Sequence, residues 1–155
     1  EVPFVRQFSP EHGLQERLEG PVPDGLDPAT GLPGVSFSGP NRKPRPEHSS
    51  DVDVLVFDLQ DIGCRFYTYA STLGLAEEAA AERGKKVVVL DPVNPITGRY
   101  KEGPVLGDGL TFVGFYDVPL RHGLTVGELA RLDQVEKGLP LRLTVVRCEN
   151  WQRRQ

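Results

Sequence analysis

The stretches "DVLVFDLQ" at residues 53–60 and "KKVVVLD" at residues 85–91 decide the fold class of this chain. Each is a continuous apolar run that ends in an acid, which is typical of a central strand buried on both faces of a parallel sheet. Between them, "STLGLAEEAAAERG" at residues 71–84 is rich in helix formers, and Gly84 stands where a left-handed residue commonly ends a helix. The sequence therefore predicts a strand–helix–strand unit.

The flanking segments extend this pattern. Residues 2–8 are apolar enough for a strand, whereas residues 20–47 hold many prolines and glycines and are predicted to form a long surface loop. Thr125 and Glu128 are three residues apart, the spacing at which each side chain can accept a hydrogen bond from the other residue's backbone N–H at the start of a helix. Residues 141–148 then form a further predicted strand. This alternation of helices and strands predicts an α/β protein with a mainly parallel sheet and flanking helices.

Composition narrows the possible partners. The 155 residues suit one ordinary domain, and the net charge of -4 does not favour a nucleic-acid binder. The apolar runs fall far short of the roughly 20 residues that a membrane span needs. The two cysteines, Cys64 and Cys148, are far apart in sequence and have no zinc-ligand spacing. We therefore expect no nucleic-acid partner, no membrane span and no metal site.

Polar side chains follow the predicted strands at the place where open α/β sheets bind ligands, beyond the carboxyl ends of the strands. Carboxyl pairs hydrolyse glycosidic bonds, and the aromatic string "RFYTY" at residues 65–69 offers faces that suit sugar rings. For each acid taken alone, a helix cap or a loop anchor is an equally good interpretation. The candidates are Glu11 and His12 after the first strand, Asp58, Gln60 and Asp61 after the second, and Asp91 and Asn94 after the third.

Other well-known chemistries lack their motifs in this sequence. No GxGxxG follows a strand, no phosphate-binding GxxxxGK[ST] is present, and no GxSxG marks a serine hydrolase. Asp58, Asp61, Asp91 and His12 supply enough ligands for a hard cation, but they have no ligand spacing. A metal-dependent hydrolase therefore remains a minor alternative.

Six long strings, taken together and in order, cover nearly the whole chain. They are "FSPEHG" (8–13), "VDVLVFDLQDIGCRFYTYASTL" (52–73), "VVVLDPVNPITG" (87–98), "EGPVL" (102–106), "FVGFYDVPLRHGLTVGELARL" (112–132) and "LTVVRCENW" (143–151). In these strings the chain resembles the NamZ-type exo-β-N-acetylmuramidases, a family formerly catalogued as a domain of unknown function, DUF1343.

The resemblance implies a glycoside hydrolase that releases N-acetylmuramic acid from the non-reducing end of peptidoglycan fragments, in cell-wall turnover and recycling. Its substrates would be muropeptides or disaccharides, it would need no cofactor, and it would act in the periplasm or outside the cell. Family members look like two-domain proteins. Residues 1–155 match their Rossmann-like N-terminal catalytic domain. We expect this domain to be incomplete at both ends in the present chain, and we expect the C-terminal domain of the family to be absent from it.

The resemblance also implies that Glu11 in "PEHG" and Glu102 in "EGP" are the two catalytic acids. Which of them donates the proton stays open, because that depends on their surroundings in the fold. The alternative for Glu11 is a carboxylate that accepts backbone N–H groups in a tight turn, and the alternative for Glu102 is an ordinary surface loop.

The remaining site residues are predicted to bind substrate or to orient the two glutamates. A guanidinium matches the lactyl carboxylate of muramic acid in a two-pronged manner, so Arg65 or Arg121 is expected to contact it. An aromatic ring can stack on the sugar or belong to the core. The full set of substrate-binding predictions is His12, Asp58, Gln60, Asp61, Arg65, Tyr67, Asn94, Arg121 and His122. The competing function is a non-catalytic module that binds muropeptides or sugars.

Overall fold

The computed structural model describes residues 3–11, 13 and 22–154, and the chain divides into two compact units, residues 1–53 and 54–155. Each unit has a three-stranded sheet of its own. The assignment of residues 1–155 to a single catalytic domain stays a prediction. No helix in the described ranges is long and apolar enough to cross a membrane.

The first unit contains three short strands and one helical turn: β1 (Gln7–Ser9), β2 (Gly25–Leu26), β3 (Pro33–Ser36) and α1 (Pro46–Ser49). Strand β3 lies in the middle of this sheet, parallel to β1 and antiparallel to β2. The prediction that residues 20–47 are only a surface loop is therefore wrong. Pro33 occupies the first position of β3, where the missing N–H is tolerated, and Val35 and Phe37 are buried.

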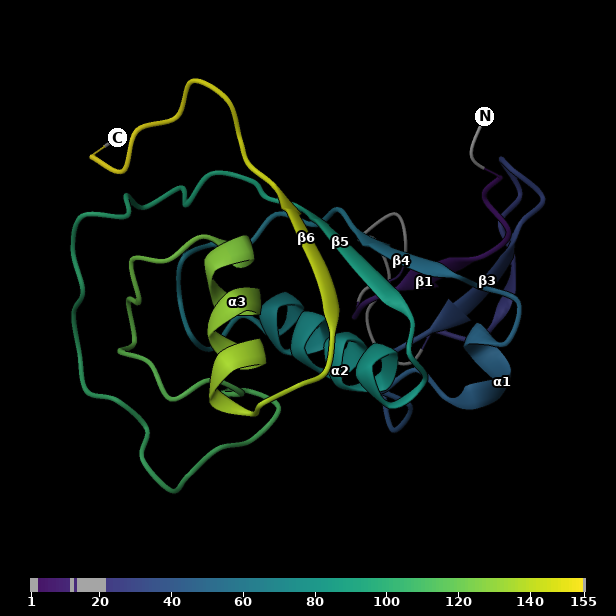
Figure 1. Cartoon of the computed structure of the whole chain (residues 1–155), viewed down its shortest axis with the longest axis horizontal. Helices are drawn as coiled ribbons and strands as arrows, with labels where there is room; N and C mark the ends of the chain where they lie inside the picture. The colour runs from purple at the N-terminus through teal and green to yellow at the C-terminus, as the bar shows by residue number, and fades with distance from the viewer. Residues whose placement is uncertain (1–2, 12, 14–21, 155) are drawn as a thin grey trace. The chain divides into compact units, whose positions relative to one another are not determined.

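The second unit carries the predicted strand–helix alternation: β4 (Val54–Phe57), α2 (Thr68–Glu82), β5 (Lys86–Leu90), α3 (Val126–Glu136) and β6 (Arg142–Val146). All three strands are parallel, in the order β4-β5-β6, with Phe57 opposite Val89 and Val89 opposite Val145 (Figure 1). This arrangement confirms the α/β class, with a parallel sheet and flanking helices.

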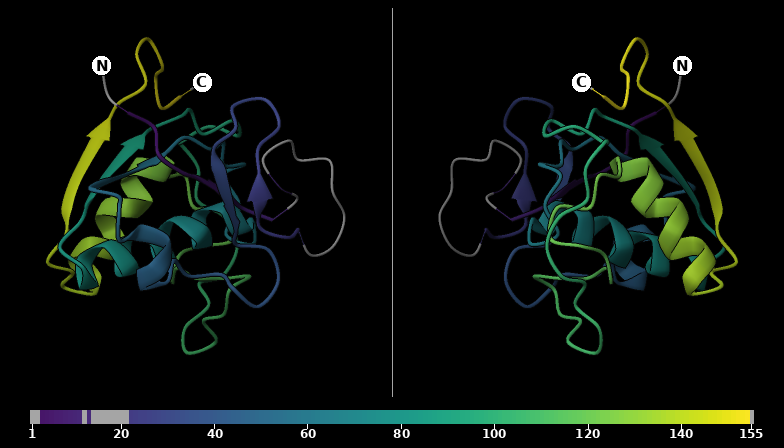
Figure 2. Two further views of the ribbon diagram at one scale, coloured as in Figure 1. Left: turned by 90° about the vertical axis from the view of Figure 1, so that its right-hand side faces the viewer. Right: turned by 90° about the vertical axis from the view of Figure 1, so that its left-hand side faces the viewer.

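Both long helices of this unit lie on the same side of β5 and β6 (Figure 2). Side chains on that side, such as Leu55 and Val87, are buried, whereas Val54 and Val56 on the other side are 41% and 52% exposed. The prediction that residues 53–60 form a central strand buried on both faces is therefore wrong, because β4 lies at one end of the described sheet and its second face exposes Val54 and Val56. An apolar run alone does not reveal which face is covered.

The helix ends follow the sequence predictions. Gly84 has a φ of 63° just after α2, and the amide of Lys85 donates to the carbonyl of Ala80 at 2.9 Å, which is the bonding pattern of a left-handed helix end. At the start of α3, the Thr125 hydroxyl accepts from the Glu128 amide at 3.3 Å, and the Glu128 carboxylate accepts from the Thr125 amide at 3.0 Å. Both predicted caps are confirmed.

Candidate active site

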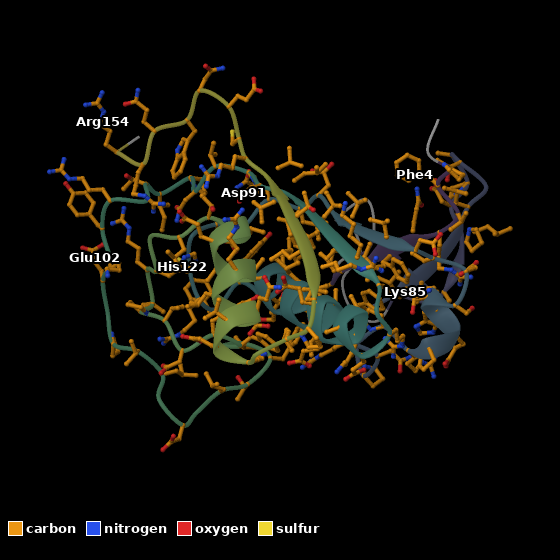
Figure 3. All side chains as sticks on the ribbon, in the orientation of Figure 1. Phe4, Lys85, Asp91, Glu102, His122 and Arg154 are labelled. Carbon is orange, nitrogen blue, oxygen red and sulfur yellow. The ribbon has the colours of Figure 1, made fainter. Side chains whose placement is uncertain are left out.

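Glu102 lines a pocket of about 350 Å³ in the second unit. Loops beside α3 form the pocket, and Figure 3 shows Glu102 and His122 on these loops. The side chain of Glu102 is 64% exposed. Of the residues predicted from the sequence, Glu102 and Arg121 both line this cavity. The complete lining is Cys64, Ile96, Glu102, Gly103, Leu120 and Arg121.

Arg121 holds Glu102 through both its side chain and its backbone. One guanidinium nitrogen, Nη1, lies 2.5 Å from Oε2 of Glu102, and Nη2 donates to the carbonyl of Ile96. The backbones of the two residues also pair, with N–O distances of 3.0 and 2.9 Å in the two directions. Because the backbone pairing fixes both Cα positions, the ion pair is a geometrically constrained feature of the pocket.

Two glycines allow the loops around this ion pair to approach each other closely. Gly103 has a φ of 81°, and a Cβ there would lie 2.8 Å from Cβ of Leu120. Gly123 has a φ of 67°, and a Cβ there would lie 2.8 Å from the carbonyl oxygen of Tyr100. A larger residue at either position would strain the backbone and push the loops apart.

Gln60 and Asn94 connect neighbouring loops through their amide groups. The Gln60 side chain donates to the carbonyl of Val93 at 2.9 Å. Asn94 is buried, and its side chain donates to the carbonyl of Leu124 at 2.9 Å and accepts from the amide of Ile96 at 3.1 Å. Both side chains therefore hold the strand-end loops together, and direct contact of either with a substrate stays a prediction.

Arg65 and Tyr67 lie on the turn that leads into α2. The Arg65 guanidinium donates from Nη1 to the carbonyls of Pro104 and Val118 at 2.7 and 2.6 Å, so it braces the loop that follows Glu102. Tyr67 is the N-cap residue of α2 and packs against Tyr69 with ring centroids 4.8 Å apart. Tyr69 is buried, so of the two roles considered for the aromatics it belongs to the core.

Asp61 and His122 are placed side by side in the interior, 4% and 1% exposed, whereas Asp58 lies on the surface. Nε2 of His122 is 3.6 Å from Oδ2 of Asp61. Neither side chain lines the pocket, but Arg121, the neighbour of His122 in sequence, does.

Asp91 has a structural role at the start of α3. Its carboxylate accepts from the Gly127 amide at 2.7 Å and from the Thr125 hydroxyl at 2.8 Å, so it caps the start of α3. Burial is the largest influence on the pKa of Asp91 and raises it, although both hydrogen bonds act to lower it. Of the two interpretations of a strand-end acid, the helix cap is the correct one here.

Glu11 follows β1 in a tight turn of the first unit. The amide of Gly13 donates to the carbonyl of Pro10 at 3.2 Å, and Gly13 has a φ of 75°. Glu11 is half-buried in this turn, and His12 lies outside the described residues. Since Glu11 and Glu102 belong to different compact units, their action at one site stays a prediction.

Several contributors to the site were not predicted from the sequence. Cys64 and Leu120 line the pocket. The only sequence feature that could have indicated them is their position next to the predicted site residues Arg65 and Arg121. Arg153 donates to the carbonyl of Gly123 at 2.8 Å and pairs with Glu128, which ties residues near the end of the chain to the loop that holds Arg121. Across the ranges that the structure describes, no three His, Cys, Asp or Glu side chains are placed to hold one metal ion.

The fold and the pocket together define an α/β protein with a surface carboxylate–guanidinium site on the loops of a parallel sheet. The family model described as "Exo-beta-N-acetylmuramidase NamZ, N-terminal" matches residues 1–155. The chain belongs to this family.

Known relatives agree with this assignment. The chain is 43% identical over 157 residues to the peptidoglycan β-N-acetylmuramidase NamZ of Bacillus subtilis, covering 99% of this chain and 38% of that protein. Crystal structures of two DUF1343 family proteins from Bacteroides fragilis superpose with TM-scores of 0.90 and 0.83, at 45% and 35% identity. Each match covers 97% of this chain and 39% or 40% of the other. The chain thus spans about two fifths of the length of these relatives.

Proposed function

We propose that this chain carries the active site of a glycoside hydrolase that releases N-acetylmuramic acid from the non-reducing end of peptidoglycan fragments. The Bacillus subtilis relative is named for β-N-acetylmuramidase activity on peptidoglycan, and the alignment covers 99% of the present chain and 38% of that protein. We place the activity in cell-wall turnover and recycling, in the periplasm or outside the cell.

The observation that carries this proposal is the position of Glu102. It is an exposed carboxylate on the wall of a pocket, and Arg121 fixes it from the backbone and from the side chain. A glycosidase needs one carboxyl group to protonate the leaving oxygen and a second to act on the anomeric carbon or on a water molecule. We propose Glu11 as the partner of Glu102, with the two carboxyl groups within about 10 Å of each other in the working enzyme.

Of the two arginines considered for the lactyl carboxylate, Arg121 is the one that lines the pocket. Both contacts of the Arg65 guanidinium at Nη1 are to backbone carbonyls, which suits a bracing role. We therefore assign recognition of the substrate carboxylate to Arg121, which would contact the carboxylates of Glu102 and of the sugar from one guanidinium group.

A chromogenic muramic-acid glycoside tests this function in the complete protein. We expect release of the chromogen by the wild type and a loss of at least about a hundredfold in kcat for Glu102→Gln, because the amide neither ionises nor transfers a proton. Glu149→Gln is the matched control, since Glu149 is exposed and does not line the pocket. Absence of release by the wild type between pH 5 and 9, with retained binding of muramyl ligands, would instead identify a binding module.

A further inference from the structure

Asp61 and His122 form a buried polar pair that faces inward from two loops. The two side chains are 4% and 1% exposed, and Nε2 of His122 lies 3.6 Å from Oδ2 of Asp61. Within the described residues, Nε2 of His122 and Oδ1 of Asp61 have no hydrogen-bond partner. Leaving buried polar groups unsatisfied costs free energy, so a pair of this kind calls for a physical explanation.

The hydrogen bond on the other side of the imidazole sets its tautomer. The amide of Leu124 donates to Nδ1 of His122 at 3.1 Å, so Nδ1 is an acceptor. A neutral imidazole then carries its proton on Nε2, the nitrogen that faces Asp61. The separation of 3.6 Å is longer than a hydrogen bond. A shift of less than 1 Å would nevertheless let the Nε2–H group donate to the carboxylate.

Both members of the pair are connected to the pocket wall. Oδ2 of Asp61 accepts from the amide of Gly63 at 2.7 Å, and a Cβ at Gly63 would lie 2.5 Å from Oδ1 of Asn94, so this turn is tightly packed. The next residue, Cys64, forms a β-bridge with Arg121, which directly precedes His122. The pair therefore lies where two of the backbone segments that line the pocket meet, and one of these segments carries Arg121, the partner of Glu102.

We propose that Asp61 and His122 are positioning residues, which close to a hydrogen bond when a substrate engages Arg121 and thereby hold the Arg121–Glu102 pair in its working geometry. This inference rests on the proposed function of the same site. Hydrogen bonds in active sites are often long before substrate binds and shorten in the reactive complex. A displacement of Arg121 would move Glu102 through their shared backbone pairing, so loss of the pair lowers kcat more than it raises KM.

Three variants of the complete protein test this role. Asp61→Asn removes the charge at nearly constant shape. His122→Gln can keep a donor near the position of Nε2, whereas His122→Asn keeps only the acceptor near Nδ1. We expect Asp61→Asn and His122→Asn to lose at least tenfold in kcat with KM changed less than threefold, and His122→Gln to recover a substantial part of the loss.

Melting temperatures and the imidazole spectrum complete the test. Histidine ¹H–¹⁵N spectra of the wild type should show the neutral Nε2–H tautomer for His122, and this resonance should shift when a muramyl ligand binds. An Nδ1–H tautomer, equal losses in the two His122 variants, or a fall in kcat that follows the melting temperature would overturn the positioning role. An inactive wild type would refute the proposed function itself, while the tautomer and its shift remain measurable.

Discussion

Glu77 gives the fold a stability that depends on pH. It is fully buried in α2, and neither carboxyl oxygen has a hydrogen-bond partner among the residues described. Burial, and secondly the charge of Asp133 on α3, raise the pKa of Glu77 from 4.5 to about 9, against a smaller lowering by Lys137. Lys137 contacts Asp133 and Glu78 at 2.9 and 2.8 Å, so its charge is already shared between two carboxylates.

The size of the effect follows from the two pKa values. Between pH 4.5 and about 9 the folded protein keeps the Glu77 proton while the unfolded chain has released it. The stability contributed by this group is therefore complete below pH 4.5 and is lost progressively as the pH rises to about 9. At about 1.4 kcal/mol per pH unit, the free energy of unfolding has fallen by about 3 kcal/mol at pH 7 because of this group.

Glu77→Gln removes this titration and keeps the shape of the side chain. The buried amide has its own desolvation cost, but that cost does not change with pH. We expect the free energy of unfolding of the variant, relative to the wild type, to rise by about 2–4 kcal/mol between pH 5 and pH 8. Other buried acids, such as Asp133, titrate in both proteins, so their contributions to the difference in unfolding free energy largely cancel.

Urea unfolding followed by circular dichroism at several pH values measures this difference. Glu82→Gln is the matched control, because Glu82 lies on the same helix with an exposed side chain, and its difference from the wild type should stay within a few tenths of a kcal/mol. A Glu77→Gln difference that is the same at pH 5 and pH 8 would refute the burial of an uncompensated acid.

Two further substitutions test the packing of the second unit. Gly74→Ala should destabilise the protein by about 1–3 kcal/mol despite the better helix propensity of alanine, because the new Cβ would lie 2.2 Å from the Phe115 ring. Its urea midpoint should recover when Phe115→Leu is added, and a stabilised single variant would contradict the contact. Asp91→Ala should cost about 1–3 kcal/mol of unfolding free energy, since the Gly127 amide and the Thr125 hydroxyl lose their acceptor. Unchanged thermal unfolding would show that this cap does not stabilise α3.

Local signals explain most of what the sequence predicted correctly. The caps at Gly84 and Thr125 depend on residues close in sequence, so their patterns are visible without the fold. Strand β3 escaped prediction because it is short and begins with Pro33. The open face of β4 also escaped prediction, because a run such as "VLVF" reads the same whether one or two helix layers cover the sheet.

The site was predictable in part for the same reason. The family resemblance singled out Glu102, and the match of a guanidinium to a carboxylate suggested Arg65 or Arg121. The structure brings Glu102 and Arg121 together in one pocket. Asp91 looked like any other acid at a strand end, and its capping role depends on Gly127, 36 positions away. The burial of Asp61 against His122 likewise depends on a contact between distant loops, which no local pattern encodes.

The most direct test of the central claim measures kcat on a muramic-acid glycoside for Glu11→Gln, Glu102→Gln and the double variant of the complete protein. If both carboxyl groups act on one glycosidic bond, each single variant should lose at least about a hundredfold, and the double variant should be little worse than the poorer single one. Losses below tenfold in either single variant would contradict a shared two-glutamate site.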